Sequence, residues 1–250
     1  MNKLTTTEQF LLQRRTVRHF KDKTLSQEQY QRLLEVARQA PTSNFLQQCS
    51  MIRVTDVEKR ERIRNICQQK YVGAYGDLII FVVDLYRNHR IRAQLGLADD
   101  GLASTDAFIQ GIEDTIIAAQ SVVMAAESMG LASVYLGSIQ NDVRPIIQIL
   151  NLPKLTFPLV GLQIGEPDQV PELKPRMPLT LRSFENSYED VFDLNHFAEY
   201  DATVKTYYDL RDRSKHVDSF TQQIASKLSQ SHFKRDDIAA VIKEQGFCQY

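Results

Sequence analysis

The stretch Asp77–Leu85, DLIIFVVDL, is a near-continuous apolar run with the length of one strand. A strand that faces solvent on one side alternates apolar and polar residues. This run does not alternate, so it predicts a strand buried on both faces. Three further segments have strand character: SMIRVT near 50–55, ASVYL at 132–136 and FPLVGLQI at 157–164.

Helices are predicted around these strands and dominate the chain. The segment near 102–129 is apolar over most of its circumference, which is typical of a helix central to a core or covered by a partner subunit. The other helices are expected over 4–14, from the capping residue Ser26 to before Pro41, from Asp56 to about 68, from Asn141 or Asp142 to about 150, and near 195–211, 217–229 and 235–245.

The charge balance is almost neutral, with a net charge of -1, and gives no general attraction to nucleic acid or membranes. Residues 1–70, however, carry 14 Lys and Arg against 7 Asp and Glu, which favours an anionic ligand near the N-terminus. Three cysteines without a CxxC pair argue against a disulfide framework. With no signal-peptide core and no apolar span, we expect a cytoplasmic protein.

Several common catalytic motifs are absent from the sequence. There is no HExxH, no Cys/His cluster, no phosphate-binding GxxxxGK[ST] loop, no GxGxxG fingerprint and no GxSxG elbow. The five histidines are scattered without metal-ligand spacing, so no metal site is predicted. The lack of a helix-turn-helix signature and the neutral charge argue against a DNA-binding module.

Residues 14–18, RRTVR, concentrate positive charge just after the first predicted helix. Arg14 and Arg18 are four residues apart, so they would share a face if a helical turn continued. Guanidinium groups bind phosphate oxygens in bidentate pairs. Taken alone, the segment fits either a phosphate site or a solvated surface patch.

Four other segments carry groups that suit a ligand. Gln69 presents an amide that can both donate and accept at the edge of a heterocyclic ring, and Gly137 lets a backbone N–H approach a ligand closely. Each segment also has a purely structural interpretation, as a turn, a frayed helix end or an exposed loop. The segments are PTSNFLQ at 41–47, CQQKYV at 67–72, YLGS at 135–138 and LKPR at 173–176.

Together these segments resemble the FMN-dependent nitroreductases, specifically the NADPH-preferring group of oxygen-insensitive nitroreductases and NADPH-flavin oxidoreductases. The similar stretches run in family order over about residues 8–210. They are RRTVRHF at 14–20, SNFLQ at 43–47, QQKYV at 68–72, AQLGLAD at 93–99, AAESMGLASVYLGSIQND at 125–142, PLVGLQIG at 158–165, PDQVPELKPRMP at 167–178 and ENSY at 185–188.

The resemblance implies an α+β nitroreductase-like fold with a mixed central sheet of about four to five strands, a long buried central helix and an intertwined homodimer. It implies one domain over 1–250, with 195–250 as a helical C-terminal excursion, and FMN at the subunit interface. The FMN phosphate would be held by Arg14, Arg15, Thr16, Arg18, Lys174 and Arg176. The ring would contact Gln69 at its pyrimidine edge, Tyr135, Leu136, Gly137 and Ser138 along its length, and Ser43 and Asn44 of the facing subunit.

The implied activity is a ping-pong transfer of hydride from NADPH through FMN to a nitroaromatic, quinone or flavin acceptor. No side chain need be catalytic, because the chemistry takes place at FMN N5 near the Gly137 N–H. Arg211, Arg213 and Lys215 are the cations available for the coenzyme 2′-phosphate. Two departures from the group are Arg14, where relatives can carry histidine, and Gln140, where arginine is common.

Three alternatives remain open at the level of the sequence. The first is a reductase of the same fold with a narrower acceptor, such as a disulfide, an azo bond or a metal chelate. The second is a non-catalytic FMN-binding or sensing protein. The third is a structural dimer module with an empty site.

Overall fold

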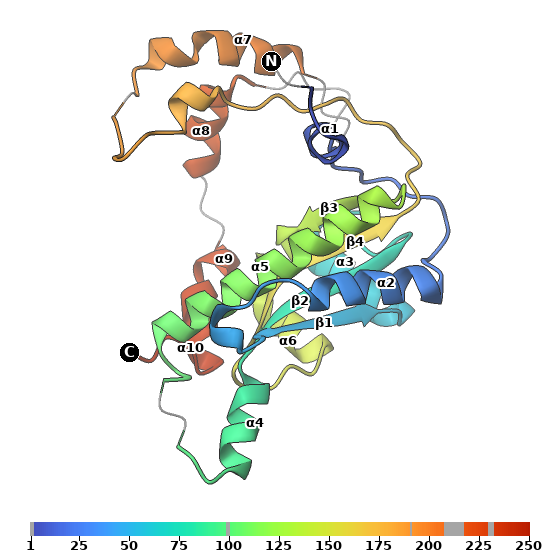
Figure 1. The fold of residues 1–250 in the computed structure, drawn as a ribbon, viewed down its shortest axis with the longest axis vertical. Helices are drawn as coiled ribbons and strands as arrows, with labels where there is room; N and C mark the ends of the chain where they lie inside the picture. The colour runs from blue at the N-terminus through green and yellow to red at the C-terminus, as the bar shows by residue number, and fades with distance from the viewer. Residues whose placement is uncertain (1–2, 99–100, 191, 208–217, 230–232) are drawn as a thin grey trace. The chain divides into compact units, whose positions relative to one another are not determined.

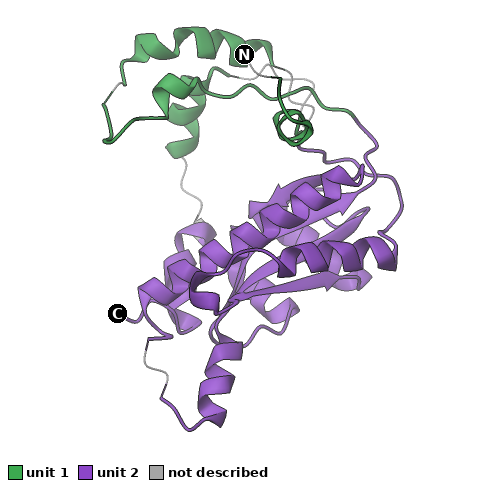
Figure 2. Ribbon diagram, in the orientation of Figure 1, with its two compact units in different colours: residues 1–15, 170–231 green, residues 16–169, 232–250 purple. Residues whose placement is uncertain are grey.

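The structure, a computed structural model, describes residues 3–98, 101–190, 192–207, 218–229 and 233–250. Backbone contacts group the chain into two compact units, which Figure 2 shows in different colours. The smaller unit combines residues 1–15 with 170–231, and the larger unit combines 16–169 with 232–250. The larger unit contains the sheet and most of the predicted flavin-site residues.

The sheet of the larger unit has four strands in the order β1-β2-β4-β3. All three ladders between them are antiparallel. Among the described residues, the parallel pairing expected of a mixed sheet is confined to an isolated bridge between Thr16 and Ser133. The strands are β1 (Cys49–Val54), β2 (Asp77–Asp84), β3 (Ala132–Leu136) and β4 (Thr156–Gly165).

Strand β2 confirms the prediction of a strand covered on both faces. Leu78 and Ile80 enter one hydrophobic cluster, while Ile79 and Phe81 enter another, and all four side chains are buried. Successive side chains of a strand point to opposite faces, so an apolar run without alternation supplies both clusters at once.

Helices cover the two faces of this sheet. The long helix α5 (Thr105–Ser128) runs along one face with α2 (Gln27–Arg38) beside it (Figure 1). The cluster on the other face takes its helical residues from α3 (Val57–Cys67), α6 (Val143–Ile149) and the short 3-10 helix η2 (Gly137–Asn141). The predicted caps are confirmed at Ser26 and Asp56, whose side chains each accept a backbone N–H of the first turn. Ser104 caps α5 in the same way. Asp142 is the N-cap residue of α6, but its side chain makes no capping bond, so the capping bond expected there is wrong.

The C-terminal residues complete the larger unit. It contains α4 (Tyr86–Gln94), α9 (Phe233–Asp236) and α10 (Ile238–Glu244). The backbone oxygen of Tyr250 accepts the Thr105 N–H at 3.0 Å, which ties the last residue to the start of α5. The Arg144 guanidinium on α6 bonds both Glu244 and Asp237. Residues 232–250 therefore belong with the sheet, and the prediction of one domain over 1–250 stays a prediction.

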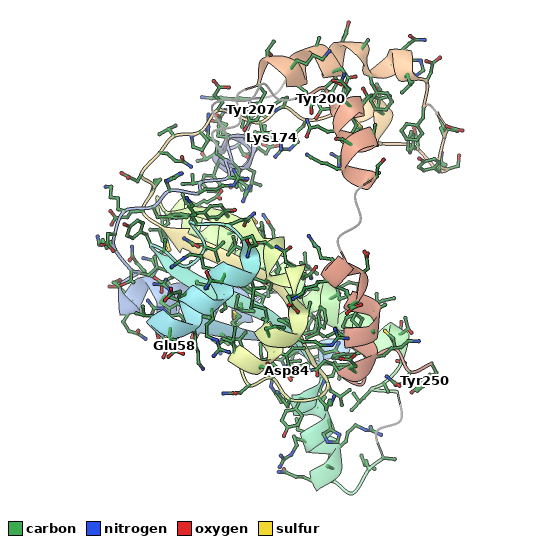
Figure 3. The ribbon with its side chains drawn as sticks, turned by 180° about the vertical axis from the view of Figure 1, so that it is seen from behind. Glu58, Asp84, Lys174, Tyr200, Tyr207 and Tyr250 are labelled. Atoms are coloured by element: carbon green, nitrogen blue, oxygen red, sulfur yellow. The ribbon has the colours of Figure 1, made fainter. Side chains whose placement is uncertain are left out.

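The smaller unit contains α1 (Thr6–Leu12), α7 (Ala198–Thr206) and α8 (Phe220–Leu228). Phe197 and Phe220 stack with their ring centroids 6.1 Å apart, and Asp201 accepts both the N–H and the hydroxyl of Thr221. The Tyr200 hydroxyl donates to the Pro175 carbonyl at 3.5 Å, in the loop that carries Lys174 (Figure 3). Because α7 ends at Thr206 and α8 begins at Phe220, the helices expected near 195–211 and 217–229 are shorter than predicted within the described residues.

The first helix does not continue through residues 14–18, so Arg14 and Arg18 do not share a helical turn. Helix α1 ends at Leu12, and the Val17 N–H donates to the Ser133 carbonyl at 3.2 Å on the edge strand β3. Pairing with the sheet is favoured over a further helical turn because it buries Val17 and Phe20 in the core, whereas a solvated helical turn would leave them exposed. Within the described residues, no helix is long and apolar enough to cross a membrane.

Candidate functional site

The extended segment after Thr16 fixes the backbone of Arg18 against the larger unit. Thr16 bridges to Ser133, and Phe20 bridges to Pro167, so Arg18 lies between two points of sheet-like pairing. The Arg18 Nε atom is buried and makes no hydrogen bond within the described part of the chain. A buried cationic donor without a partner is costly, and an anionic ligand removes that cost.

Gln69 and Ser138, which are 69 residues apart, meet directly. The Ser138 hydroxyl donates to Gln69 Oε1 at 2.9 Å, and the Tyr71 hydroxyl donates to the same oxygen at 2.9 Å. Gln69 follows the end of α3, and Ser138 follows the end of β3. Two of the residues predicted to face the ring therefore share one site, with Tyr71 as a third member.

The end of β3 presents backbone rather than side chains. The Leu136 side chain is buried in the cluster under α3 and α6, while Tyr135 packs toward α5 and donates its hydroxyl to Gln120 at 2.9 Å. Gly137 is exposed, and a Cβ added to it would meet no atom within 4 Å. Tyr135 and Leu136 are thus packing residues whose backbone leads to an open position at Gly137.

The loop with Ser43 and Asn44 is tied to α5 by polar side chains. The Ser43 hydroxyl and the Asn44 amide both donate to Gln110 Oε1 at 3.1 Å, and the buried Asp114 carboxylate accepts the Ser43 N–H. Asn44 and Phe45 have left-handed φ angles of 50° and 60°. Such strained backbone persists where surrounding contacts enforce it, and it concentrates at functional sites.

Phe45 follows directly in this loop, with 83% of its surface exposed. It borders a cavity of about 670 Å³ in the larger unit, beside α4 and the start of α5. The Arg87 guanidinium at the cavity bonds the Gln47 carbonyl at 2.8 Å and Asp84 at 3.0 Å, so its charge is already partnered.

The site includes residues that sequence reasoning missed. Asp114 and Gln110 hold the Ser43–Asn44 loop, and Gln163 and Tyr71 shape the loop beside Gln69. A signal existed for two of them, because Asp114 interrupts an apolar helix and Gln163 interrupts an apolar strand. Polar residues at core positions require partners, but the sequence does not say which partners.

Four predicted phosphate ligands belong to the smaller unit, and two show local bonds there. Arg15 donates to the Gln13 carbonyl at 2.7 Å, and Arg176 donates to the Lys174 carbonyl at 2.9 Å. The convergence of Arg14, Arg15, Lys174 and Arg176 with Arg18 stays a prediction. The proposed coenzyme-phosphate cations Arg211, Arg213 and Lys215 lie outside the described residues.

Two cysteines near the site are unsuited to nucleophilic chemistry. Burial raises the pKa of the Cys49 thiol to about 12, and burial also raises the pKa of the Cys67 thiol despite the opposing influence of the nearby Ser138 hydroxyl. Both thiols therefore stay protonated at neutral pH, and a protonated thiol is a poor nucleophile.

Gln140, the departure noted in the sequence, donates to the Leu159 carbonyl at 2.6 Å.

Comparison with known proteins defines the class of this architecture: it is the fold of the nitroreductase-type oxidoreductases. Nitroreductase A from Vibrio parahaemolyticus superposes with a TM-score of 0.88 at 32% identity, covering 99% of this chain and 100% of that one. The NADPH:FMN oxidoreductase from Vibrio harveyi, complexed with NAD⁺, gives 0.87 at 31% identity and covers 98% and 100%.

The sequence comparisons agree with this class. The model of the nitroreductase family matches residues 11–166, and that of the nitroreductase family C-terminal domain matches 174–250. An NADPH-dependent oxidoreductase of Staphylococcus aureus (strain MRSA252) is 34% identical over 240 residues, which is 94% of each chain. The chain belongs to the nitroreductase family, and the resemblance found in its motifs is confirmed.

Proposed function

We propose that this chain binds FMN as a homodimer and uses NADPH to reduce nitroaromatic, quinone or flavin acceptors by a ping-pong mechanism. Its similarity to the Staphylococcus aureus NADPH-dependent oxidoreductase and the Vibrio harveyi NADPH:FMN oxidoreductase supports NADPH as the coenzyme and FMN as the bound flavin. The observation that carries the proposal is the buried, unpartnered Arg18 Nε, located on the same unit as the Gln69–Ser138 pair and the open Gly137.

The described residues fit a phosphorylated planar heterocycle. Arg18 and Thr16 would hold the phosphate, together with Arg14, Arg15, Lys174 and Arg176 of the smaller unit. Gln69 would bond the ring edge and Ser138 would lie along the ring, and the absence of a side chain at Gly137 leaves room for its N–H to face the ring. When bound, FMN supplies the ring that takes hydride from NADPH and passes it to the acceptor.

The chain's own contribution is to bind and orient. Backbone and amide donors at a ring edge stabilise negative charge that develops on reduction, because they are already aimed when the charge appears. No side-chain acid or base is needed, and the protonated thiols of Cys49 and Cys67 take no part. The proposed location of this enzyme is the cytoplasm, where a reducing environment keeps its three cysteines free.

An apolar stripe on α5 supports the homodimer. Ile109, Ile116, Ile117 and Met124 are each at least 37% exposed, and their spacing of seven, eight and fifteen residues puts them on one side of the helix. Covering this stripe with the same stripe of a second copy would bury the apolar surface. In such a dimer, Ser43 and Asn44 would reach the flavin of the facing subunit.

The experiment is direct. Purified protein should be yellow, NADPH should bleach it without oxygen, and a nitroaromatic, quinone or flavin should restore the colour. Initial rates with both substrates varied should give the parallel double-reciprocal lines of a ping-pong enzyme, and sedimentation should give a dimer. A colourless protein that FMN cannot reconstitute overturns the proposal. Bound FMN without turnover with NADPH or NADH would indicate a flavin-binding protein instead.

A further inference from the structure

Gln163 is a fully buried amide in the central strand β4. Its Oε1 accepts the Gly73 N–H at 2.8 Å, and its Nε2 donates to the carbonyls of Tyr71 at 2.9 Å and Tyr75 at 2.8 Å. One side chain therefore satisfies three backbone groups of the loop that joins α3 to β2. A buried amide with these partners is fixed in place, because losing any of them leaves a polar group unsatisfied.

The same loop is held from a second direction by α3. Arg64 donates through Nε to the Val72 carbonyl at 2.8 Å and through its guanidinium to the Gly73 carbonyl at 3.0 Å. Gly73 has a left-handed φ of 61°, so the loop conformation depends on a residue without a side chain. The backbone of Tyr71 consequently has a defined position relative to the sheet.

Tyr71 in turn holds the side chain of Gln69. Its hydroxyl donates to Gln69 Oε1 at 2.9 Å, and the Ser138 hydroxyl donates to the same oxygen at 2.9 Å. A carbonyl oxygen has two lone pairs, and these two donors use both. The Gln69 amide therefore has only its NH₂ group left to offer a ligand.

We propose that Gln163 and Tyr71 are positioning residues that fix the orientation of the Gln69 side-chain amide. In this orientation the NH₂ group, and not the oxygen, faces the bound ring, so Gln69 acts toward the ring as a donor only. It can then bond a ring oxygen or an unprotonated ring nitrogen, and it cannot accept from a ring N–H. A fixed donor favours the reduced ring, which carries more negative charge than the oxidised ring. This inference rests on the proposed flavin function and adds a role for two residues that are not among those proposed to contact the ring.

The test compares four variants of the full-length protein reconstituted with FMN. Tyr71→Phe removes only the hydroxyl, and Gln163→Met removes the three loop bonds at similar volume. Each is expected to weaken FMN binding about three- to tenfold, the scale of one neutral hydrogen bond, and to lower the midpoint potential of the bound flavin. Tyr75→Phe and Gln245→Met are the matched controls.

Gln245 suits this comparison because it is also a buried glutamine that donates to two carbonyls, those of Pro153 and Thr156, both at 2.9 Å. It binds at the opposite end of β4 from Gln163. Gln245→Met should therefore lower the melting temperature while leaving FMN affinity and midpoint potential unchanged. Tyr75→Phe should change neither, since Tyr75 contributes only its carbonyl to Gln163.

The decisive measurement is a double-mutant cycle with Gln69→Ala. If Tyr71 acts through Gln69, Tyr71→Phe should have no further effect on affinity or potential in the Gln69→Ala background. Equal effects in both backgrounds overturn the inference, as does a loss of FMN affinity in Gln245→Met equal to that in Gln163→Met. If the wild-type protein itself takes up no FMN, it is the proposed function that fails.

Discussion

The Asp114 carboxylate, buried in the middle of α5, accepts the backbone N–H of Ser43 at 2.7 Å. Its second oxygen accepts the Gln48 N–H at 2.9 Å, so one side chain binds both ends of the loop that carries Asn44 and Phe45. The loop is therefore attached to the long helix α5 at a buried position, and this attachment holds the left-handed residues between the two bonds.

Asp114→Asn tests this attachment. The amide keeps one acceptor but turns an NH₂ group toward a backbone donor, so we expect the free energy of unfolding to fall by about 1.5–3 kcal/mol, the scale of a hydrogen bond to a charged group. Chemical denaturation measures it. Asp106→Asn is the control, because that carboxylate is exposed and accepts the Gln110 amide of the same helix at 2.6 Å. Equal stability of the two variants would contradict the attachment.

Arg18→Ala tests the phosphate site. Removing the guanidinium, whose Nε atom is buried, should weaken FMN binding by about 1.5–3 kcal/mol, which is roughly ten- to more than a hundredfold in the dissociation constant. Fluorescence quenching of FMN by apoprotein measures it. Lys21→Ala removes a nearby cation that pairs with Glu166 at 3.5 Å, and should leave the affinity unchanged. Unchanged affinity in Arg18→Ala removes this arginine from the site.

Gly111→Ala tests the packing of α5 on β2. A Cβ at Gly111 would lie 2.6 Å from Val83 Cγ1, and both residues are buried, so the helix or the strand must shift. Overpacking of this kind costs about 1–3 kcal/mol of unfolding free energy. Val83→Ala in the same chain should recover part of the loss, and a double-mutant cycle by denaturation measures that coupling. Simple additivity of the two changes would show that the contact is not the cause.

Acid should weaken the attachment of α10 to α6. The hydrogen bonds from Arg144 lower the pKa of Glu244 below 4.5. A carboxyl whose pKa is lowered on folding contributes stability above its unfolded pKa, and that contribution disappears as the pH falls through the folded pKa. Glu244→Gln should therefore have a lower melting temperature than wild type at pH 7, and the difference should shrink below about pH 4.5. A difference independent of pH would contradict this.

Local patterns were sufficient for most elements. The apolar run of β2, the caps at Ser26 and Asp56, and the long α5 all follow from residues close in sequence, and each is confirmed. Whether a helical turn would continue through Arg14 and Arg18 could not be read in this way, because the competing bridge of Thr16 to Ser133 joins segments more than a hundred residues apart. Hydrophobic periodicity carries no information about such a partner.

The sequence by itself was enough to identify the family, to predict a strand buried on both faces, and to propose Arg18, Gln69 and Ser138 as site residues. Those conclusions depend on residue types and their order, which any reader of the chain can see. Only the tertiary structure decided that Gln163 binds the loop beside Gln69, that Tyr71 donates to Gln69, and that Asp114 holds the Ser43 loop. A buried polar group must find partners, and which distant backbone groups become those partners depends on how the sheet and helices pack.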